Sequence, residues 1–149
     1  MSIPAATLPA AALPVKERGS KAFLEGHYAL SINEYTNAIK IAPKYAPLYS
    51  QRAAAYMRLN QLPKALQDAR VATDIDERWA KGWMRLGEVM QAIGETETDP
   101  TGLKLLYGAV EETYENACDL LQLESSNGGK QFEEAEKQLK EVREKLASL

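Results

Sequence analysis

Apolar residues recur with helical spacing along most of the chain, in stretches separated by turn-forming residues. Asn60 followed by Pro63 is typical of one helix ending and the next beginning. Pro43 follows an earlier helical stretch, which cannot easily continue through it. Asp99 and Pro100 are typical of an N-cap and a first helical position. We therefore expect an all-α protein. The pattern predicts helices over residues 14–25, 28–41, 47–59, 63–75, 79–93, 100–122 and 130–147.

The helices form a repeat, because segments of the chain align with one another at a constant offset. Gly19 aligns with Ala53 and then with Gly87, and Tyr35 aligns with Ala69. Small residues recur where one helix must approach the next closely. Helix-turn-helix units with this period, about 34 residues, stack into solenoids, so we expect a right-handed α-solenoid.

The offset also predicts how the chain is divided. Its expected parts are a flexible Ala/Pro-rich arm (1–12), three repeats (13–46, 47–80 and 81–124) and a terminal helix (129–149).

The third repeat carries an insertion near 95–105. Gly94 fits the turn position, but Tyr107, Tyr114 and Ala117 come about 11 residues too late. We expect residues 95–101 to form a loop. We expect the remaining inserted residues to lengthen the following helix at its start. A loop insertion of this size is tolerated at little cost in free energy.

The last segment has one apolar stripe on an otherwise charged helix. The stripe consists of Phe132, Ala135, Leu139, Val142 and Leu146, spaced 3, 4, 3 and 4 residues apart. A solenoid needs a terminal element with a polar outer face, and this helix suits that role. A dimeric coiled coil is the alternative, but two heptads are fewer than that assignment needs. We favour a capping helix.

Composition narrows the class of protein. The chain has 149 residues, 45% of them hydrophobic, with a net charge of −3 and one cysteine, Cys118. It offers no basic field for nucleic acid and no disulfide within the chain. We find no apolar run of membrane-spanning length, and the N-terminus lacks the positive region of a signal peptide. We expect a cytoplasmic protein with neither nucleic-acid nor membrane partners.

Catalytic chemistry finds no support in the sequence. The single histidine, His27, follows Gly26 in a turn, where exposure is expected. Cys118 falls on the inner part of a helix, as a small apolar core residue does. The sequence shows no metal-ligand cluster, phosphate-binding glycine loop or nucleophile–base pair. We therefore expect that the protein is not an enzyme, that it has no catalytic residue, and that it binds neither a metal ion nor a cofactor.

Three stretches resemble a known family: Val15–Tyr28, Tyr49–Tyr56 and Trp79–Arg85. They are similar to the tetratricopeptide-repeat (TPR) domains of co-chaperones, such as the heat-shock organising protein and the TPR immunophilins. The resemblance extends over about residues 13–94. It implies a monomeric adaptor that binds an acidic C-terminal tail of a heat shock protein of the 70 or 90 type, ending in Glu-Glu-Val-Asp.

The resemblance also implies a carboxylate clamp that grips the terminal carboxylate and the last aspartate of such a tail. The clamp positions are Lys16, Ser20, Gln51, Lys81 and Arg85. The three cations match the family pattern, whereas Ser20 and Gln51 stand where the family has asparagine. Charge-assisted hydrogen bonds are about twice as strong as neutral ones. The three matching cations would supply these stronger bonds, whereas Ser20 and Gln51 would supply only neutral ones.

Further groove positions implied by the resemblance are Phe23, Ala54, Met57, Arg58 and Glu88. Arg58 stands where the family has a basic residue that meets the peptide, and Met57 narrows the pocket below it. Glu88 lies one turn after Arg85, so we expect it to pair with Arg85 and weaken its charge. Two alternatives remain: a TPR scaffold for an unrelated protein segment, or a self-assembly domain with exposed apolar patches.

Overall fold

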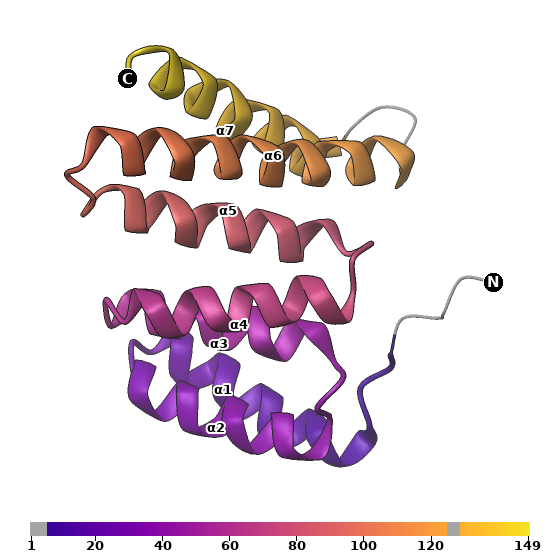
Figure 1. Ribbon diagram of the computed structural model, residues 1–149. Coiled ribbons are helices and arrows are strands. Elements are labelled where there is room, and N and C mark those ends of the chain that lie inside the picture. Colours follow the sequence, from indigo (N-terminus) through magenta and orange to yellow (C-terminus); the bar gives the residue numbers. More distant parts are fainter. Residues whose placement is uncertain (1–5, 125–128) are drawn as a thin grey trace. The chain divides into compact units, whose positions relative to one another are not determined.

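The computed structural model describes residues 6–124 and 129–149 (Figure 1). These residues form seven α-helices and no strand, and every predicted helix is confirmed to within two residues at each end. The helices are α1 (Leu13–Leu24), α2 (Tyr28–Ile41), α3 (Ala46–Arg58), α4 (Leu62–Ile75), α5 (Ala80–Gly94), α6 (Pro100–Glu124) and α7 (Gly129–Ala147). They belong to two compact units, Met1–Glu77 and Arg78–Leu149.

The first unit consists of two helical hairpins. Helix α1 packs on α2, α3 packs on α4, and α2 also packs on α3. The turns are made by residues that tolerate positive φ angles, Gly26 at +80° and Asn60 at +54°. The helix end predicted at Asn60 is thereby confirmed.

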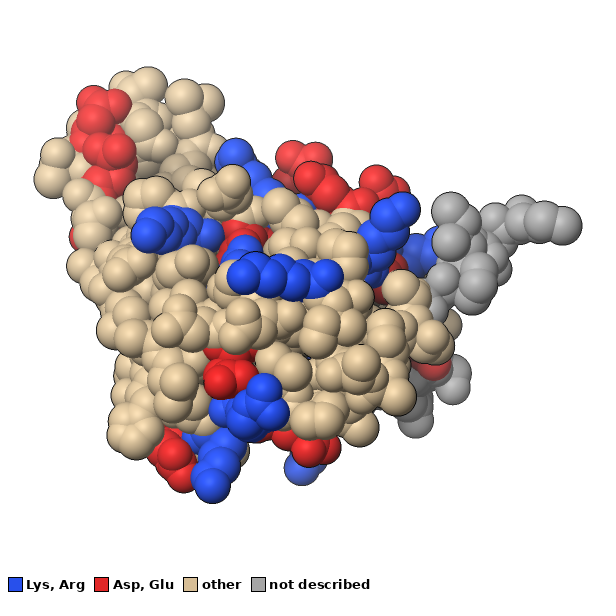
Figure 2. Space-filling model, turned by 90° about the horizontal axis from the view of Figure 1, so that it is seen from below, with Lys and Arg blue, Asp and Glu red and all other residues tan. Residues whose placement is uncertain are grey.

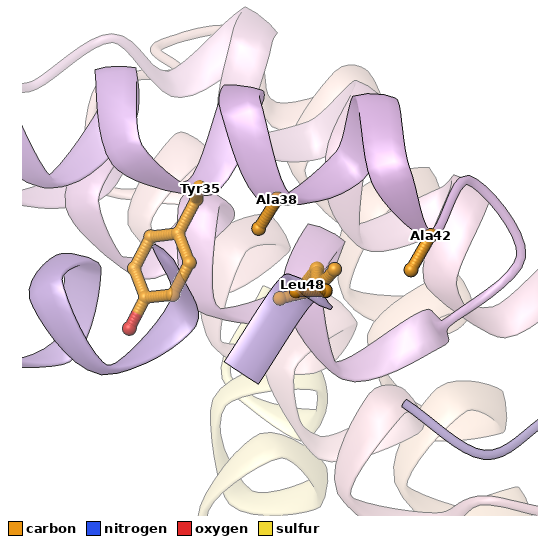
Figure 3. Close-up of a cluster of buried hydrophobic side chains, with 5 residues drawn as sticks. Tyr35, Ala38, Ala42 and Leu48 are labelled. Atoms are coloured by element: carbon orange, nitrogen blue, oxygen red, sulfur yellow. The ribbon is translucent and has the colours of Figure 1, made fainter. Parts of the chain in front are cut away.

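Small side chains let the helices of the first unit approach closely around Tyr35 (Figure 3). The ring of Tyr35 covers Gly19, where an added Cβ would lie 3.0 Å from the ring. The carbonyl of Gly19 accepts a hydrogen bond of 2.9 Å from the buried Ser31 hydroxyl. The buried cluster around the ring consists of Ala12, Tyr35, Ala38, Ala42 and Leu48.

Part of the expected N-terminal arm packs on this cluster. Residues Ala10–Ala12 form a 3-10 helix, and Ala12 is completely buried. Leu8 is half-buried against the same cluster. Residues 1–5 lie outside the described residues.

A largely buried ion pair joins α3 to α4. Arg52 donates through Nε and Nη2 to the two carboxylate oxygens of Asp68, at 2.7 Å each. Its Nη1 also donates to the hydroxyl of Thr36 on α2, at 3.1 Å. The bond to Asp68 raises the pKa of the Arg52 guanidinium, although burial opposes this. We did not predict this pair from the sequence.

The ion pair has an equivalent one repeat earlier. Arg18 and Glu34 occupy the positions of Arg52 and Asp68 in the preceding repeat, and they too form a pair, at 3.1 Å. The Arg18–Glu34 pair lies at the surface, with 58% of the Arg18 side chain exposed, whereas only 17% of the Arg52 side chain is exposed. Each pair joins residues 16 positions apart across one hairpin. This common separation is a sequence signal that could have revealed them.

In the second unit, α5 and α6 form a third hairpin. A Cβ added to Gly87 would lie 2.6 Å from Cζ of Tyr114, so only glycine fits beneath that ring. The insertion lengthens α6, as predicted, to 25 residues against 14 in α2. The loop ends at Asp99, whose carboxylate accepts a 2.7 Å bond from the Gly102 amide and so caps the helix.

Helix α7 packs on α6 along its predicted apolar stripe. Ala135, Leu139 and Val142 are buried there. At the edge of the contact, Arg143 donates to Glu111 at 2.7 Å and to Glu115 at 2.6 Å, both on α6. The terminal helix therefore covers its neighbour as a capping helix does. In the described ranges, none of the helices combines the length and the apolar character needed to cross a membrane.

Candidate peptide-binding site

Helices α1 and α3 of the first unit carry three of the predicted clamp residues. Lys16 and Ser20 lie one turn apart on α1, and Gln51 lies on α3. All three are half-buried, and the two helices contact each other.

Ser20 is bound to the second helix of its own hairpin. Its Oγ lies 2.9 Å from the phenol oxygen of Tyr35, at hydrogen-bond distance. Burial raises the pKa of the Tyr35 phenol, although the bond to Ser20 opposes this. The phenol is therefore protonated at neutral pH and can donate to Ser20. In that arrangement the Ser20 hydroxyl keeps its own hydrogen for a ligand.

The Gln51 amide has an unsatisfied acceptor. Its Oε1 is buried and has no hydrogen-bond partner among the described residues. An unpaired buried polar atom costs free energy, and an N–H of a bound peptide would relieve this. The resemblance implies a hydrogen-bond donor at this position, which the NH₂ group of Gln51 can supply. Gln51 can therefore offer a ligand both a donor and an acceptor.

The second unit carries the remaining clamp residues on α5. Lys81 is exposed and lies one turn before Arg85. Nη1 of Arg85 donates to Oε2 of Glu88, as expected from their spacing. Nε of Arg85 is buried and has no partner in the described part of the chain. About a third of the Arg85 side chain, 32%, remains exposed.

Two of the additional groove positions of the first unit, Phe23 and Arg58, lie close together, and Tyr28, which was not predicted as a site residue, completes an aromatic pair beside Arg58. The rings of Phe23 and Tyr28 pack edge to face, with centroids 5.3 Å apart. The Arg58 guanidinium lies 5.7 Å from the Phe23 centroid and 5.9 Å from that of Tyr28. The structure thus gives Arg58 a cation–π environment that we did not predict from the sequence. Ala54 and Met57 are half-buried on α3.

The predicted site residues therefore form two sets. Lys16, Ser20 and Gln51 belong to the first unit, and Lys81 and Arg85 to the second. Charges of both signs are interspersed on the face shown in Figure 2, between broad uncharged areas.

The two residues considered for catalysis have ordinary surroundings. His27 is exposed, with Nδ1 3.6 Å from Glu25. Cys118 is buried as predicted, and burial raises the pKa of its thiol. Over residues 6–124 and 129–149, no three His, Cys, Asp or Glu residues are grouped so as to hold a metal ion.

Similar sequences include tetratricopeptide-repeat proteins and Hsp70-Hsp90 organizing proteins. The chain is 41% identical over 83 residues to small glutamine-rich tetratricopeptide repeat-containing protein 2 of Saccharomyces cerevisiae, covering 56% of this chain and 24% of the relative. It is 37% identical over 93 residues to the Hsp70-Hsp90 organizing protein of Triticum aestivum, covering 60% and 16%. The chain thus spans about a quarter or less of these relatives. No protein-family model matches it.

Similar solved structures are TPR domains. The Sgt2 TPR domain from Aspergillus fumigatus has a TM-score of 0.76 and 28% identity, covering 93% of this chain and 81% of that one. The TPR2B domain of yeast Sti1 in complex with an Hsp70 peptide has a TM-score of 0.75 and 25% identity, covering 90% and 97%. The first TPR domain of Spaghetti (RPAP3), bound to the HSP90 peptide SRMEEVD, has a TM-score of 0.73 and 25% identity, covering 91% and 93%.

The helical hairpins and these similarities define the class of fold, which is that of solved TPR domains. More particularly, the chain is similar to the TPR domains of the Sgt2, Sti1 and Hsp70–Hsp90 organizing co-chaperones.

Proposed function

We propose that this domain is a co-chaperone adaptor that binds the acidic C-terminal tail of a heat shock protein of the 70 or 90 type. Lys16, Ser20, Gln51, Lys81 and Arg85 are its proposed carboxylate clamp, with Phe23, Ala54, Met57, Arg58 and Glu88 as further contacts. The role is binding rather than catalysis, by a monomer in the cytoplasm.

The observation that carries the proposal is the incomplete pairing of Arg85. A guanidinium has five N–H donors, and Arg85 uses one for Glu88 while Nε has no acceptor among the described residues. Leaving a charged donor buried and unpaired is costly, so a carboxylate that binds there gains a charge-assisted bond. The exposed Lys81, one turn away, supplies a second cation for the same carboxylate.

The first unit supports the same ligand chemistry more weakly. Lys16 is the cation there, and Ser20 and Gln51 offer neutral bonds worth about 0.5–1.5 kcal/mol each. Solved TPR domains with this fold are bound to Hsp70 and HSP90 peptides, one of them SRMEEVD with its terminal aspartate. These complexes support a tail peptide as the ligand.

Alanine substitution of the cations tests the proposal. Each charge-assisted bond is worth about 1.5–3 kcal/mol, so Lys16→Ala, Lys81→Ala and Arg85→Ala should each weaken SRMEEVD binding at least about tenfold in calorimetry. Lys137→Ala, which removes an equal charge from an exposed position on α7, serves as the control and should leave affinity unchanged. Equal losses in all four variants would mean that only net charge matters, and the proposed site would be wrong.

A further inference from the structure

The arm segment, residues 8–12, stands in place of a side-chain cap at the start of α1. The first turn of an α-helix leaves backbone amides without partners, and a side-chain oxygen at the N-cap usually accepts from one of them. The N-cap residue here is Ala12, which has no such oxygen, and the first turn of α1 contains no acidic residue. The Ala12 amide donates to the Pro9 carbonyl at 2.9 Å. The Leu13 amide donates to the Ala10 carbonyl, so the arm segment supplies backbone acceptors instead.

Two apolar side chains fix the arm segment to the core of the first unit. Ala12 is completely buried in the cluster around Tyr35 (Figure 3), and Leu8 packs against the same cluster. Val15, in the first turn of α1, also packs there. The cluster therefore holds the backbone on both sides of the point where the arm segment passes into α1.

Lys16, the clamp cation proposed for the first unit, directly follows this anchored turn. In an α-helix the carbonyl of the N-cap residue pairs with the amide four residues later, and Lys16 stands four residues after Ala12. None of the ion pairs in the described part of the chain includes Lys16. Its ammonium is therefore placed by the backbone of the first turn rather than by an acidic partner.

The order of this turn bears on binding. Helix ends open more readily than helix interiors, because their terminal groups have few partners. Without the arm segment, the first turn of α1 would lose both its backbone acceptors and its anchor, and it would fray with Lys16 in it. A ligand that binds a cation on a frayed turn must order that turn, which costs conformational entropy. A turn that is already fixed avoids this cost.

We propose that the arm segment is a positioning element of the tail-binding site, which orders the first turn of α1 and so holds Lys16 in place for an acidic group of the ligand. Leu8 and Ala12 are its positioning residues. The inference rests on the proposed function, because it presumes that Lys16 contacts the tail. It extends the site to a part of the chain for which the sequence predicts only a flexible arm.

A double-mutant cycle with the SRMEEVD peptide tests the inference by calorimetry. The arm variant combines Leu8→Ala with Ala12→Gly, which removes both anchors, and it is measured alone and together with Lys16→Ala. Leu105→Ala is the matched control, because it removes the same atoms as Leu8→Ala from an exposed position on α6. Leu8→Met keeps the volume of the anchor. Both of these single variants should leave the affinity unchanged.

The arm variant should weaken binding about two- to tenfold, and by no more than Lys16→Ala does. Together with Lys16→Ala it should cause no further loss, because the residue that it positions is absent. An equal loss with and without Lys16, or no loss at all, overturns the inference alone. If Lys16→Ala has no effect, or no protein binds the peptide, the inference fails together with the role of Lys16 in the proposed function.

Amide hydrogen exchange of the ligand-free proteins gives a readout that does not depend on the peptide. In the arm variant, the amides of residues 15–17 should exchange at least about tenfold faster, whereas amides in the middle of α3 should keep their rates. This pattern would distinguish local fraying of α1 from a general loss of stability. Unchanged exchange at residues 15–17, or equally faster exchange in α3, would overturn the inference.

Discussion

The hydroxyl of Ser20 lies 2.9 Å from the phenol oxygen of Tyr35, which joins a proposed clamp residue on α1 to the buried core of its hairpin. From the sequence alone, the change from asparagine to Ser20 is only the loss of a donor. The structure adds a partner that orients the serine.

Tyr35→Phe tests this orientation. It should weaken tail binding about two- to tenfold, the value of one neutral hydrogen bond, because the Ser20 hydroxyl loses its partner. Ser20→Ala should have a similar effect. The double variant should bind little more weakly than either single variant, because both substitutions break the same Ser20–Tyr35 hydrogen bond. Calorimetry on the three variants measures this. Full additivity would show that Tyr35 does not act through Ser20.

Gly87→Ala should destabilise the fold. The new Cβ would lie 2.6 Å from the Tyr114 ring, which is completely buried and cannot move aside. We expect a loss of about 1–3 kcal/mol in the free energy of unfolding, measured by urea denaturation. Gly108→Ala is the matched control on α6: nothing lies within 4 Å of its Cβ, so helix propensity should raise stability by about 0.5–1 kcal/mol. Similar losses in both variants would contradict the close helix approach.

The two equivalent ion pairs should differ in their contribution to stability. Asp68→Ala leaves Arg52 charged, largely buried and without its carboxylate, which should cost about 3–5 kcal/mol. Glu34→Ala breaks the equivalent pair at the surface and should cost at most about 1 kcal/mol. Urea denaturation of both variants compares them. Equal losses would show that the burial difference between the two repeats has no energetic effect.

Removal of the terminal helix should destabilise the second unit. Deleting residues 129–149 exposes the face of α6 that α7 covers, and nearest-neighbour packing carries the stability of a repeat protein. The truncated chain should melt at a lower temperature or aggregate. Deleting only Ser148 and Leu149, which lie beyond α7, is the control and should have little effect. An unchanged melting temperature in the long deletion would show that α7 does not act as a cap.

The periodic features of the fold could be predicted because they repeat. Gly87 stands one repeat after Ala53, and Tyr114 comes later than the same offset requires because α6 accommodates the inserted length. The contacts of individual polar groups could not be predicted in the same way. Whether Arg58 meets a peptide or the rings of Phe23 and Tyr28 depends on side-chain directions at a helix end, which no sequence spacing determines.

The central claim is that the domain binds the free C-terminal carboxylate of an acidic tail. Calorimetry with SRMEEVD as the free acid and as the C-terminal amide tests it most directly, because the two peptides differ in that one charged group. Loss of a charge-assisted interaction of about 1.5–3 kcal/mol predicts that the amide binds at least about tenfold more weakly. Equal affinities for the two peptides, or no binding of the free acid, would contradict the account.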